Sequence, residues 1–234
     1  MNDLLGYNKI QVTIDRISEF EPPDGYYLAF SGGKDSVVLK AIADMAGVKY
    51  DAHMSLTTVD PPEVIKFIKQ YHPDVIFEHP PVNMWKLIIN HGMPPTRLIR
   101  YCCSELKETG GINRLVLTGI RWEESSKRKE RQMVDLCRTD TRKRYLHPLI
   151  DWTEFEIWDF IREKKLPYCS LYDEGFKRIG CVMCPMASKK QRIWHISRFP
   201  NFYRAYLRTF DKLVKEKKTH WESGQDVMNW WLDI

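Results

Sequence analysis

Short apolar runs alternate with amphipathic stretches through the first part of the chain. Residues 26–30 form an apolar and aromatic run before a glycine pair, and apolar side chains then recur at helical spacing over 37–45. Expected strands at 50–56 and 74–77 flank a stretch of helical spacing that opens at Pro61. The pattern predicts strands that alternate with helices.

The alternation continues with a helical stretch around 84–90 and further apolar runs at 114–118 and 145–149. Such an order favours a mainly parallel sheet, because each parallel connection needs a crossover that covers one face of the sheet. We therefore expect an α/β, Rossmann-like fold with helices on both faces of the sheet.

A helical region follows. Thr153 and Glu156 match the capping box that opens a helix. The expected apolar stripe of this helix comprises Phe155, Trp158 and Ile161.

The last part of the chain has little strand character. Residues 165–187 resemble a loop, and helical spacing returns over 200–218 and 224–231. We expect an α/β domain over 1–164, followed over 165–234 by a cysteine-containing loop and a helical extension packed on that domain.

Composition and charge narrow the class of protein. The 234 residues are 43% hydrophobic, which suffices for one well-buried core of ordinary size. A net charge of +5 suits an anionic ligand but is too small to establish nucleic-acid binding. No run approaches the roughly 20 apolar residues of a membrane span, and none resembles a signal peptide, so we expect a cytoplasmic protein without a membrane partner. The six cysteines are then expected to be free thiols or metal ligands.

The glycine pair lies between the first strand and the first helix of this pattern. A glycine-rich turn there lets backbone amides approach an anion, and the helix dipole adds favourable potential. The spacing matches neither the Walker A motif nor the Gly-x-Gly-x-x-Gly of dinucleotide-binding proteins. The expected phosphate-binding residues are Ser31, Gly32, Gly33, Lys34, Asp35 and Ser36.

Each polar side chain of this loop has an expected contribution. Lys34 is the nearest cation for a pyrophosphate, since the helix dipole contributes only about 0.3–1 kcal/mol per charge. Ser31 and Ser36 add hydroxyl donors, and Asp35 is a candidate for capping the helix or for binding Mg²⁺.

Ser-Gly-Gly-Lys-Asp-Ser after an N-terminal strand resembles the PP-loop of the adenine nucleotide α-hydrolase-like superfamily. Further segments are similar to the phosphoadenosine phosphosulfate (PAPS) reductase family, from about residue 24 to residue 185. The matching segments are 31–36, 58–63, 100–103 with 106–107, 119–121 with 124–125 and 128, and 178–185. The resemblance implies a nucleotide-binding α/β domain and an adenine nucleotide, either ATP or one of the sulfonucleotides APS and PAPS.

The resemblance also directs attention to residues that follow two other strands. Asp60 would help to define the nucleotide pocket, with the cap of a solvated helix as its alternative role. Gly119 and Arg121 follow a buried strand, where a guanidinium can bind phosphate or sulfate through two hydrogen bonds. Arg128 follows in a loop that we expect to close on the ligand.

Four cysteines form a second candidate site. Cys102 and Cys103 are adjacent, while Cys181 and Cys184 form a Cys-x-x-Cys. Plant-type and many bacterial APS reductases bind a [4Fe-4S] cluster with a similar pattern, so the resemblance implies a cluster here. Zinc is the less favoured occupant because adjacent side chains tend to diverge, and a metal-free site is the third alternative.

The expected reaction depends on one difference between this sequence and the reductases of the family. Its reductases act through a cysteine nucleophile near the C-terminus, and no cysteine follows Cys184 in this sequence. The lysine-bearing loop is more similar to that of ATP-using relatives. We therefore expect ATP cleavage at the α,β bond, with Lys34, Arg121 and Mg²⁺ stabilising the leaving pyrophosphate.

Three other functions stay open. The first is an APS/PAPS reductase-like enzyme, and the second is a non-catalytic nucleotide and Fe-S accessory protein. The third is a component of DNA or tRNA sulfur modification, for which 127–131, 138–144 and 189–192 supply basic stretches. A sulfur-carrier partner and a homo-oligomer stay open as well, and Trp230, Trp231 and Leu232 are a candidate docking patch or part of the core.

Overall fold

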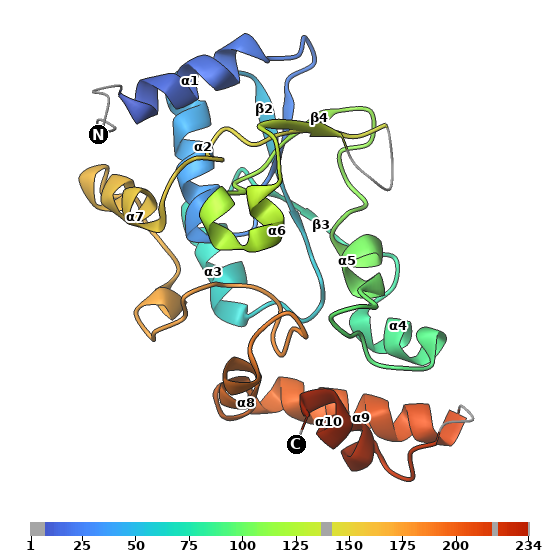
Figure 1. Cartoon of the computed structure of the whole chain (residues 1–234). Helices are drawn as coiled ribbons and strands as arrows, with labels where there is room; N and C mark the ends of the chain where they lie inside the picture. Colours follow the sequence, from blue (N-terminus) through green and yellow to red (C-terminus); the bar gives the residue numbers. More distant parts are fainter. Residues whose placement is uncertain (1–7, 137–141, 217–219, 234) are drawn as a thin grey trace. The chain divides into compact units, whose positions relative to one another are not determined.

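The computed structural model describes residues 8–136, 142–216 and 220–233 (Figure 1). They form two compact units, each built from several segments. The sheet unit contains the residues up to Met54, Pro62–Glu78 and Gly111–Ile179. The helical unit contains Ser55–Pro61, His79–Gly110 and the residues from Gly180 onward. The boundary near residue 164 that the sequence suggested stays a prediction.

Six strands form one sheet in the order β3-β2-β1-β4-β6-β5. β1 pairs in parallel with β2 and β4, β6 pairs in parallel with β4, and β5 runs antiparallel to β6. The mainly parallel sheet of the predicted Rossmann-like fold is thus confirmed. The strands are β1 (Tyr26–Ala29), β2 (Tyr50–Ser55), β3 (Ile76–Glu78), β4 (Leu115–Leu117), β5 (Val134–Leu136) and β6 (Arg144–Leu146).

β1 lies in the middle of the sheet, and three of its four side chains are buried, as expected of a central strand covered on both faces. Its neighbour β4 consists entirely of buried aliphatic residues, and Leu28 on β1 lies opposite Leu117 on β4. The loops that follow these two strands therefore leave the sheet at the same edge, where ligands bind in open α/β folds.

Among the helices of the sheet unit, α2 packs against α1 and α7 (Figure 1). The helices of this unit are α1 (Lys9–Glu19), α2 (Lys34–Ala46), α3 (Pro62–Tyr71), α6 (Ser126–Lys129) and α7 (Glu154–Glu163). Short 3-10 turns occur at Trp122–Glu124 and Ser170–Tyr172.

The predicted capping box of α7 is present, since the Thr153 hydroxyl accepts a hydrogen bond from the Glu156 amide. The predicted apolar stripe was right for Ile161, which is buried, and wrong for Phe155, which is 70% exposed. The buried side chains are Ile157, Phe160 and Ile161. A spacing of three residues alone drifts around a helix of 3.6 residues per turn, whereas spacings of three and four combined stay on one face.

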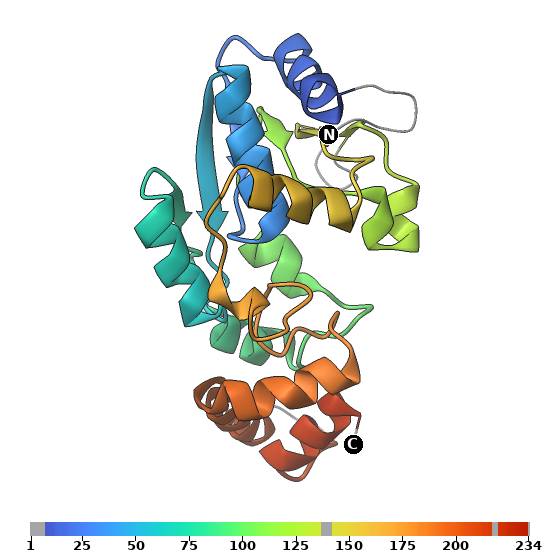
Figure 2. The same cartoon turned by 90° about the vertical axis from the view of Figure 1, so that its left-hand side faces the viewer.

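The helical unit contains α4 (Met84–His91), α5 (Tyr101–Leu106), α8 (Lys189–Arg198), α9 (Pro200–Glu216) and α10 (Gly224–Leu232). α9 contacts α4, α8 and α10, and Tyr206 and Phe210 of α9 pack their rings against Trp231 of α10 (Figure 2). The predicted helical C-terminal part is confirmed. Among the residues described, no helix combines the length and hydropathy of a membrane span.

Candidate nucleotide site and cysteine group

The phosphate loop joins β1 to α2 in the sheet unit. Gly33 is the N-cap of α2, with φ −80° and ψ 158°, and it has no side chain to cap the helix. The amide of Lys34 donates instead to the hydroxyl of Tyr172, at 2.9 Å. The positive end of the α2 dipole therefore meets polar groups that a phosphate oxygen can replace.

Gly32 gives the loop its shape through a left-handed backbone conformation, with φ 71°. A Cβ at this position would lie 2.8 Å from Cγ1 of Val64 and 3.0 Å from Cδ1 of Ile68, both on α3. Glycine is required here both for the conformation and for the close approach of the loop to α3.

The two serines of the loop bond to the loop itself. The Ser36 hydroxyl donates to the Gly33 carbonyl at 2.8 Å and accepts from the Ser31 amide at 3.2 Å. The Ser31 hydroxyl lies 3.3 Å from the Ser36 hydroxyl and accepts from the Gly33 amide at 3.4 Å. Their side chains thus hold the loop in shape, and direct phosphate contacts by the two serines stay a prediction.

Lys34 carries a buried ammonium at this loop, with only 4% of the residue exposed. Its Nζ lies 3.6 Å from the Asp35 carboxylate, 3.8 Å from the Glu154 carboxylate and 3.4 Å from the Lys177 carbonyl oxygen. The ring of Tyr172 lies below it, with its centroid 5.6 Å away. These partners hold a positive charge beside the N-terminus of α2.

Arg121 was expected to point at the ligand, and the structure shows its guanidinium bonded inside the protein. Its Nε donates to Asp35 at 2.6 Å, and its Nη1 donates to Glu123 and to the Trp152 carbonyl, each at 3.1 Å. Burial alone would lower the pKa of Arg121, but the carboxylates of Asp35, Glu124 and Glu123 together outweigh burial and raise it. In this state Arg121 holds Asp35 in place, and its phosphate contact stays a prediction.

Gly119 allows the end of β4 to approach α2. A Cβ there would lie 3.0 Å from the backbone carbon and oxygen of Asp35, which cannot rotate away. Glycine is therefore needed at 119 because any side chain would collide with the backbone of Asp35. The close contact between Gly119 and Asp35 brings Arg121, two residues later, within reach of the Asp35 carboxylate.

Arg128 lies in α6 and pairs with Glu124, whose carboxylate also accepts from the Arg121 amide at 3.0 Å. Burial, reinforced by the nearby charge of Arg178, lowers the pKa of Arg128. The carboxylates of Glu124 and Asp35 oppose this shift. A ligand contact by Arg128 stays a prediction.

Asp60 lies in the helical unit, and its carboxylate organises a turn there. It accepts from the Thr57 amide at 2.6 Å and from the Thr57 hydroxyl at 2.8 Å. Its predicted part in the nucleotide pocket stays a prediction.

The four predicted cysteine ligands all belong to the helical unit. Cys102 and Cys103 lie on α5, while Cys181 and Cys184 lie in the loop before α8. That loop is held by the Val182 amide, which donates to the Val59 carbonyl at 2.8 Å. It is also held by the Met183 amide, which donates to Nδ1 of His195 at 2.9 Å.

The thiols act on one another electrostatically, which places them close together. A hydrogen bond from Cys102, aided by the charges of Lys107 and Arg100, lowers the pKa of Cys103 to about 6. The same hydrogen bond and the nearby Cys181 and Cys184 raise the pKa of Cys102. Burial, followed by Cys181, raises the pKa of Cys184, and Cys181 in turn raises the pKa of the Lys107 ammonium. This cysteine group thus favours added positive charge, as a metal centre supplies.

All four cysteines are free thiols with partial solvent exposure. Within the described ranges, no three His, Cys, Asp or Glu side chains are grouped as one metal ion would need. A cubane cluster is wider than a single ion, because each thiolate binds a different iron atom.

Sequence reasoning missed two side chains of the nucleotide site, Tyr172 and Glu154. Both lie more than 100 residues from Lys34 in the chain, and both belong to segments without a phosphate motif. Burial raises the pKa of Tyr172, so its hydroxyl stays protonated. The only local signal was the position of Glu154 in the first turn of α7.

Comparison with known proteins gives a consistent result. Residues 25–187 match the model of the phosphoadenosine phosphosulfate reductase domain. An uncharacterized protein of Methanocaldococcus jannaschii is 30% identical over 192 residues, which cover 76% of this chain and 46% of that protein. The adenosine 5'-phosphosulfate reductase of Allochromatium vinosum is 31% identical over 121 residues, covering 50% of this chain and 45% of the reductase. This chain therefore spans less than half the length of either relative.

Among solved structures, a phosphoadenylyl-sulfate reductase from Candida auris, crystallised with phosphate, has a similar fold. The TM-score is 0.56 at 19% sequence identity, and the match covers 76% of this chain and 90% of that one. At this level of identity the likeness concerns the fold.

Proposed function

This chain belongs to the phosphoadenosine phosphosulfate reductase domain family, and we propose that it is an ATP-using member. It binds ATP at the phosphate loop and cleaves the α,β bond. The adenylyl group passes to an acceptor in sulfur metabolism or sulfur transfer, and pyrophosphate leaves.

The buried ammonium of Lys34 beside the N-terminus of α2 is the observation that supports ATP. ATP carries a triphosphate, whereas APS has one phosphate joined to sulfate, so ATP places more negative charge at the loop. A helix N-terminus alone offers about 0.3–1 kcal/mol per charge, which leaves the rest to a cation such as Lys34. The 4% exposure of Lys34 strengthens its interaction with a bound phosphate.

In the proposed reaction, a nucleophilic atom of the acceptor attacks the α-phosphorus. The bond from the α-phosphorus to the bridging oxygen breaks, and its electron pair stays on the pyrophosphate. The amides at the start of α2 and the Lys34 ammonium stabilise that developing charge. Arg121 contributes by holding Asp35, at 2.6 Å, next to Lys34. Mg²⁺ bound with ATP would add further positive charge to the leaving group, and Asp35 is the candidate carboxylate for it.

We further propose that Cys102, Cys103, Cys181 and Cys184 hold a [4Fe-4S] cluster. Such a centre supplies either one-electron chemistry or a structural brace when it is bound. The mutual influence of the thiols and the cation of Lys107 support this donor set.

The test is a titration of anaerobically purified protein with ATP, APS and PAPS, followed by assays for AMP and pyrophosphate. We expect preferred ATP binding and pyrophosphate release once a nucleophilic acceptor is present. The adenylyl group then stays on the acceptor, and an equimolar amount of AMP appears when sulfide displaces it. Lys34→Met removes the buried ammonium, and Lys177→Met is its matched control, because Lys177 meets Lys34 only through its carbonyl oxygen. ATP affinity that is equal in both variants would contradict the proposal.

A sulfonucleotide reductase is the second candidate, favoured by the similarity to the Allochromatium vinosum enzyme. Residues 185–234 contain no cysteine, so the attacking thiol would have to come from elsewhere. Preferred binding of APS or PAPS, with sulfite released in the presence of a thiol reductant, would establish this function instead. ATP binding without AMP formation would point to an accessory protein.

A further inference from the structure

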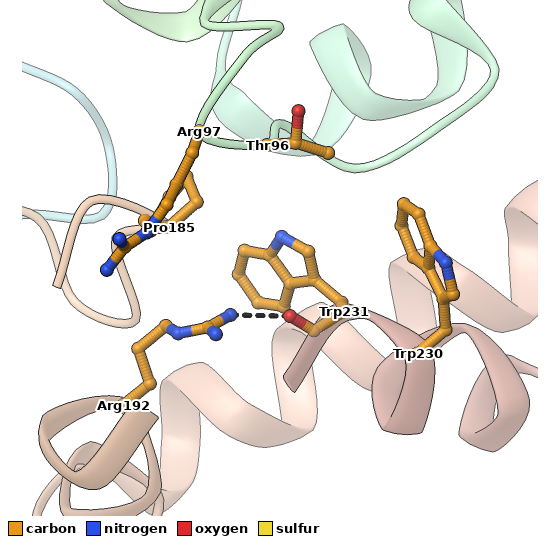
Figure 3. A pocket seen from close by; sticks show the side chains of 6 residues that line it. All are labelled: Thr96, Arg97, Pro185, Arg192, Trp230 and Trp231. Carbon is orange, nitrogen blue, oxygen red and sulfur yellow. Dashed lines mark hydrogen bonds between the residues drawn. The ribbon is translucent and has the colours of Figure 1, made fainter. Parts of the chain in front are cut away.

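The helical unit contains a pocket that the proposed reaction does not use. It is lined by Thr96, Arg97, Pro185, Arg192, Trp230 and Trp231. Figure 3 shows Arg97 and Arg192 on one side of the pocket, from the 93–100 loop and α8, with Trp231 next to Arg192 and Trp230 beyond Trp231. Pro185 directly follows Cys184, so the pocket adjoins the cysteine group.

The two arginines supply positive charge to this pocket. Arg97 donates to the carbonyls of Pro185 at 3.1 Å and Ala187 at 3.2 Å, and Arg192 donates to the Trp231 carbonyl. In the part of the chain that the structure describes, neither guanidinium forms an ion pair within 4 Å. These hydrogen-bond partners of both guanidiniums are therefore neutral carbonyls.

Arg192 is the more informative of the two, because it is 9% exposed and its Nε has no hydrogen-bond partner among the described residues. Burial, followed by the charge of Arg97, lowers the pKa of Arg192, and the exposed Asp233 and the nearby Cys184 only partly offset this. A buried guanidinium with an unused donor is costly unless a ligand completes it.

Size and shape define the ligand. The pocket holds about 140 Å³, which fits a compact tetrahedral anion and excludes a whole nucleotide. The Trp230 ring beside it is 46% exposed and rests on Trp221, with ring centroids 5.2 Å apart. An exposed tryptophan next to a cationic pocket is suited to stacking a nucleic-acid base while the phosphate lies inside.

We propose that this pocket is a second anion site, which binds the phosphate of a nucleotide through Arg97 and Arg192 while the base stacks on Trp230. The nucleotide is either free or one unit of a single-stranded nucleic acid. The site would bring such a ligand next to the cysteine group. The proposal stands independently of ATP cleavage at the phosphate loop.

The test measures binding to the anaerobically purified full chain by fluorescence anisotropy. The probes are a labelled single-stranded oligonucleotide, UMP as a competitor and inorganic phosphate as a second competitor. The variants are Arg192→Gln, Arg192→Lys and Trp230→Ala, with Arg204→Gln as a matched control, because Arg204 is an exposed arginine of α9 that bonds to Asn201. Lys34→Met serves as the control for the phosphate loop, and iron content checks that the cysteine loop is intact.

We expect Arg192→Gln to weaken oligonucleotide or UMP binding at least tenfold, and Trp230→Ala to weaken it about fivefold or more. Arg192→Lys should restore part of the affinity, while Arg204→Gln and Lys34→Met leave it unchanged. Tight, salt-dependent oligonucleotide binding with weak UMP competition identifies nucleic acid as the source, and equal competition by UMP identifies a free nucleotide. Equal affinities in Arg192→Gln, Trp230→Ala and Arg204→Gln, or no binding of any probe, would overturn the proposal.

Discussion

Gly32 and Gly47 lie at opposite ends of α2 and share a left-handed backbone, with φ 71° and 68°. Their surroundings differ. A Cβ on Gly32 would lie 2.8 Å from Val64 and 3.0 Å from Ile68, whereas a Cβ on Gly47 would have nothing within 4 Å. Gly32→Ala and Gly47→Ala therefore separate the cost of the backbone conformation from the cost of crowding the phosphate loop.

The expected magnitudes follow from these contacts. The left-handed conformation costs an alanine about 1–2 kcal/mol at either position. An extra methyl in a packed interior adds about 1–3 kcal/mol. We therefore expect Gly47→Ala to lower the free energy of unfolding by about 1–2 kcal/mol and Gly32→Ala by about 2–5 kcal/mol. Relief of the crowding moves the loop away from α3, so only Gly32→Ala should weaken ATP binding.

Both variants are compared by urea unfolding, followed by far-UV circular dichroism, and by ATP titration of the folded proteins. A common denaturant slope is needed for the comparison, since a changed slope would signal a different unfolded or native state. If Gly32→Ala lost no more stability than Gly47→Ala and kept its ATP affinity, the close packing of this loop against α3 would be refuted.

Three further predictions concern the nucleotide site, the cysteine group and one buried histidine. Lys34→Met should weaken ATP binding about tenfold to a hundredfold, measured by titration. Its loss of stability should be small, because Asp35 keeps its ion pair with Arg121 and Glu154 is half exposed. Cys184→Ser should lower iron content and absorbance near 400 nm, whereas Cys169→Ser, in the sheet unit, should not; equal iron in both would exclude Cys184 as a ligand. Burial lowers the pKa of His147 to about 4, so the unfolded chain takes up a proton first as the pH falls below about 6.5. In the wild-type chain, the free energy of unfolding should therefore fall as the pH falls from 6.5 to 4. His147→Gln should reduce the slope of that free energy against pH by the equivalent of up to one bound proton, and an unchanged slope would contradict this assignment.

Local sequence features predicted much of the fold. The apolar runs around β1 and β4 were found because buried parallel strands carry continuous apolar sequences. α5 and α8 were missed. α5 is only one and a half turns long, and α8 is rich in basic residues, so neither has a strong apolar period. β5 was missed because it is a three-residue edge strand, and its place in the sheet depends on pairing with β6.

The candidate sites show the same division. The position of the phosphate loop was predictable because glycines between a strand and a helix have a local conformational cause. The hydrogen bond from the Lys34 amide to the Tyr172 hydroxyl could not be predicted, since these residues are 138 positions apart in the sequence. Arg121 was expected at the ligand from its place after a strand, and its burial against Asp35 depends on packing that no local pattern contains.

The sequence by itself determined the alternation of strands and helices, the conformation required of Gly32 and the chemical identity of the four thiols. These follow from backbone sterics, hydrophobic periodicity and side-chain chemistry, which act within a few residues. Only the tertiary structure decided that α5 and the 181–184 loop bring their thiols together, and that Arg97, Arg192 and Trp230 line one pocket. Such convergence of distant segments depends on how helices pack around a shared core, and no short stretch of sequence determines that packing.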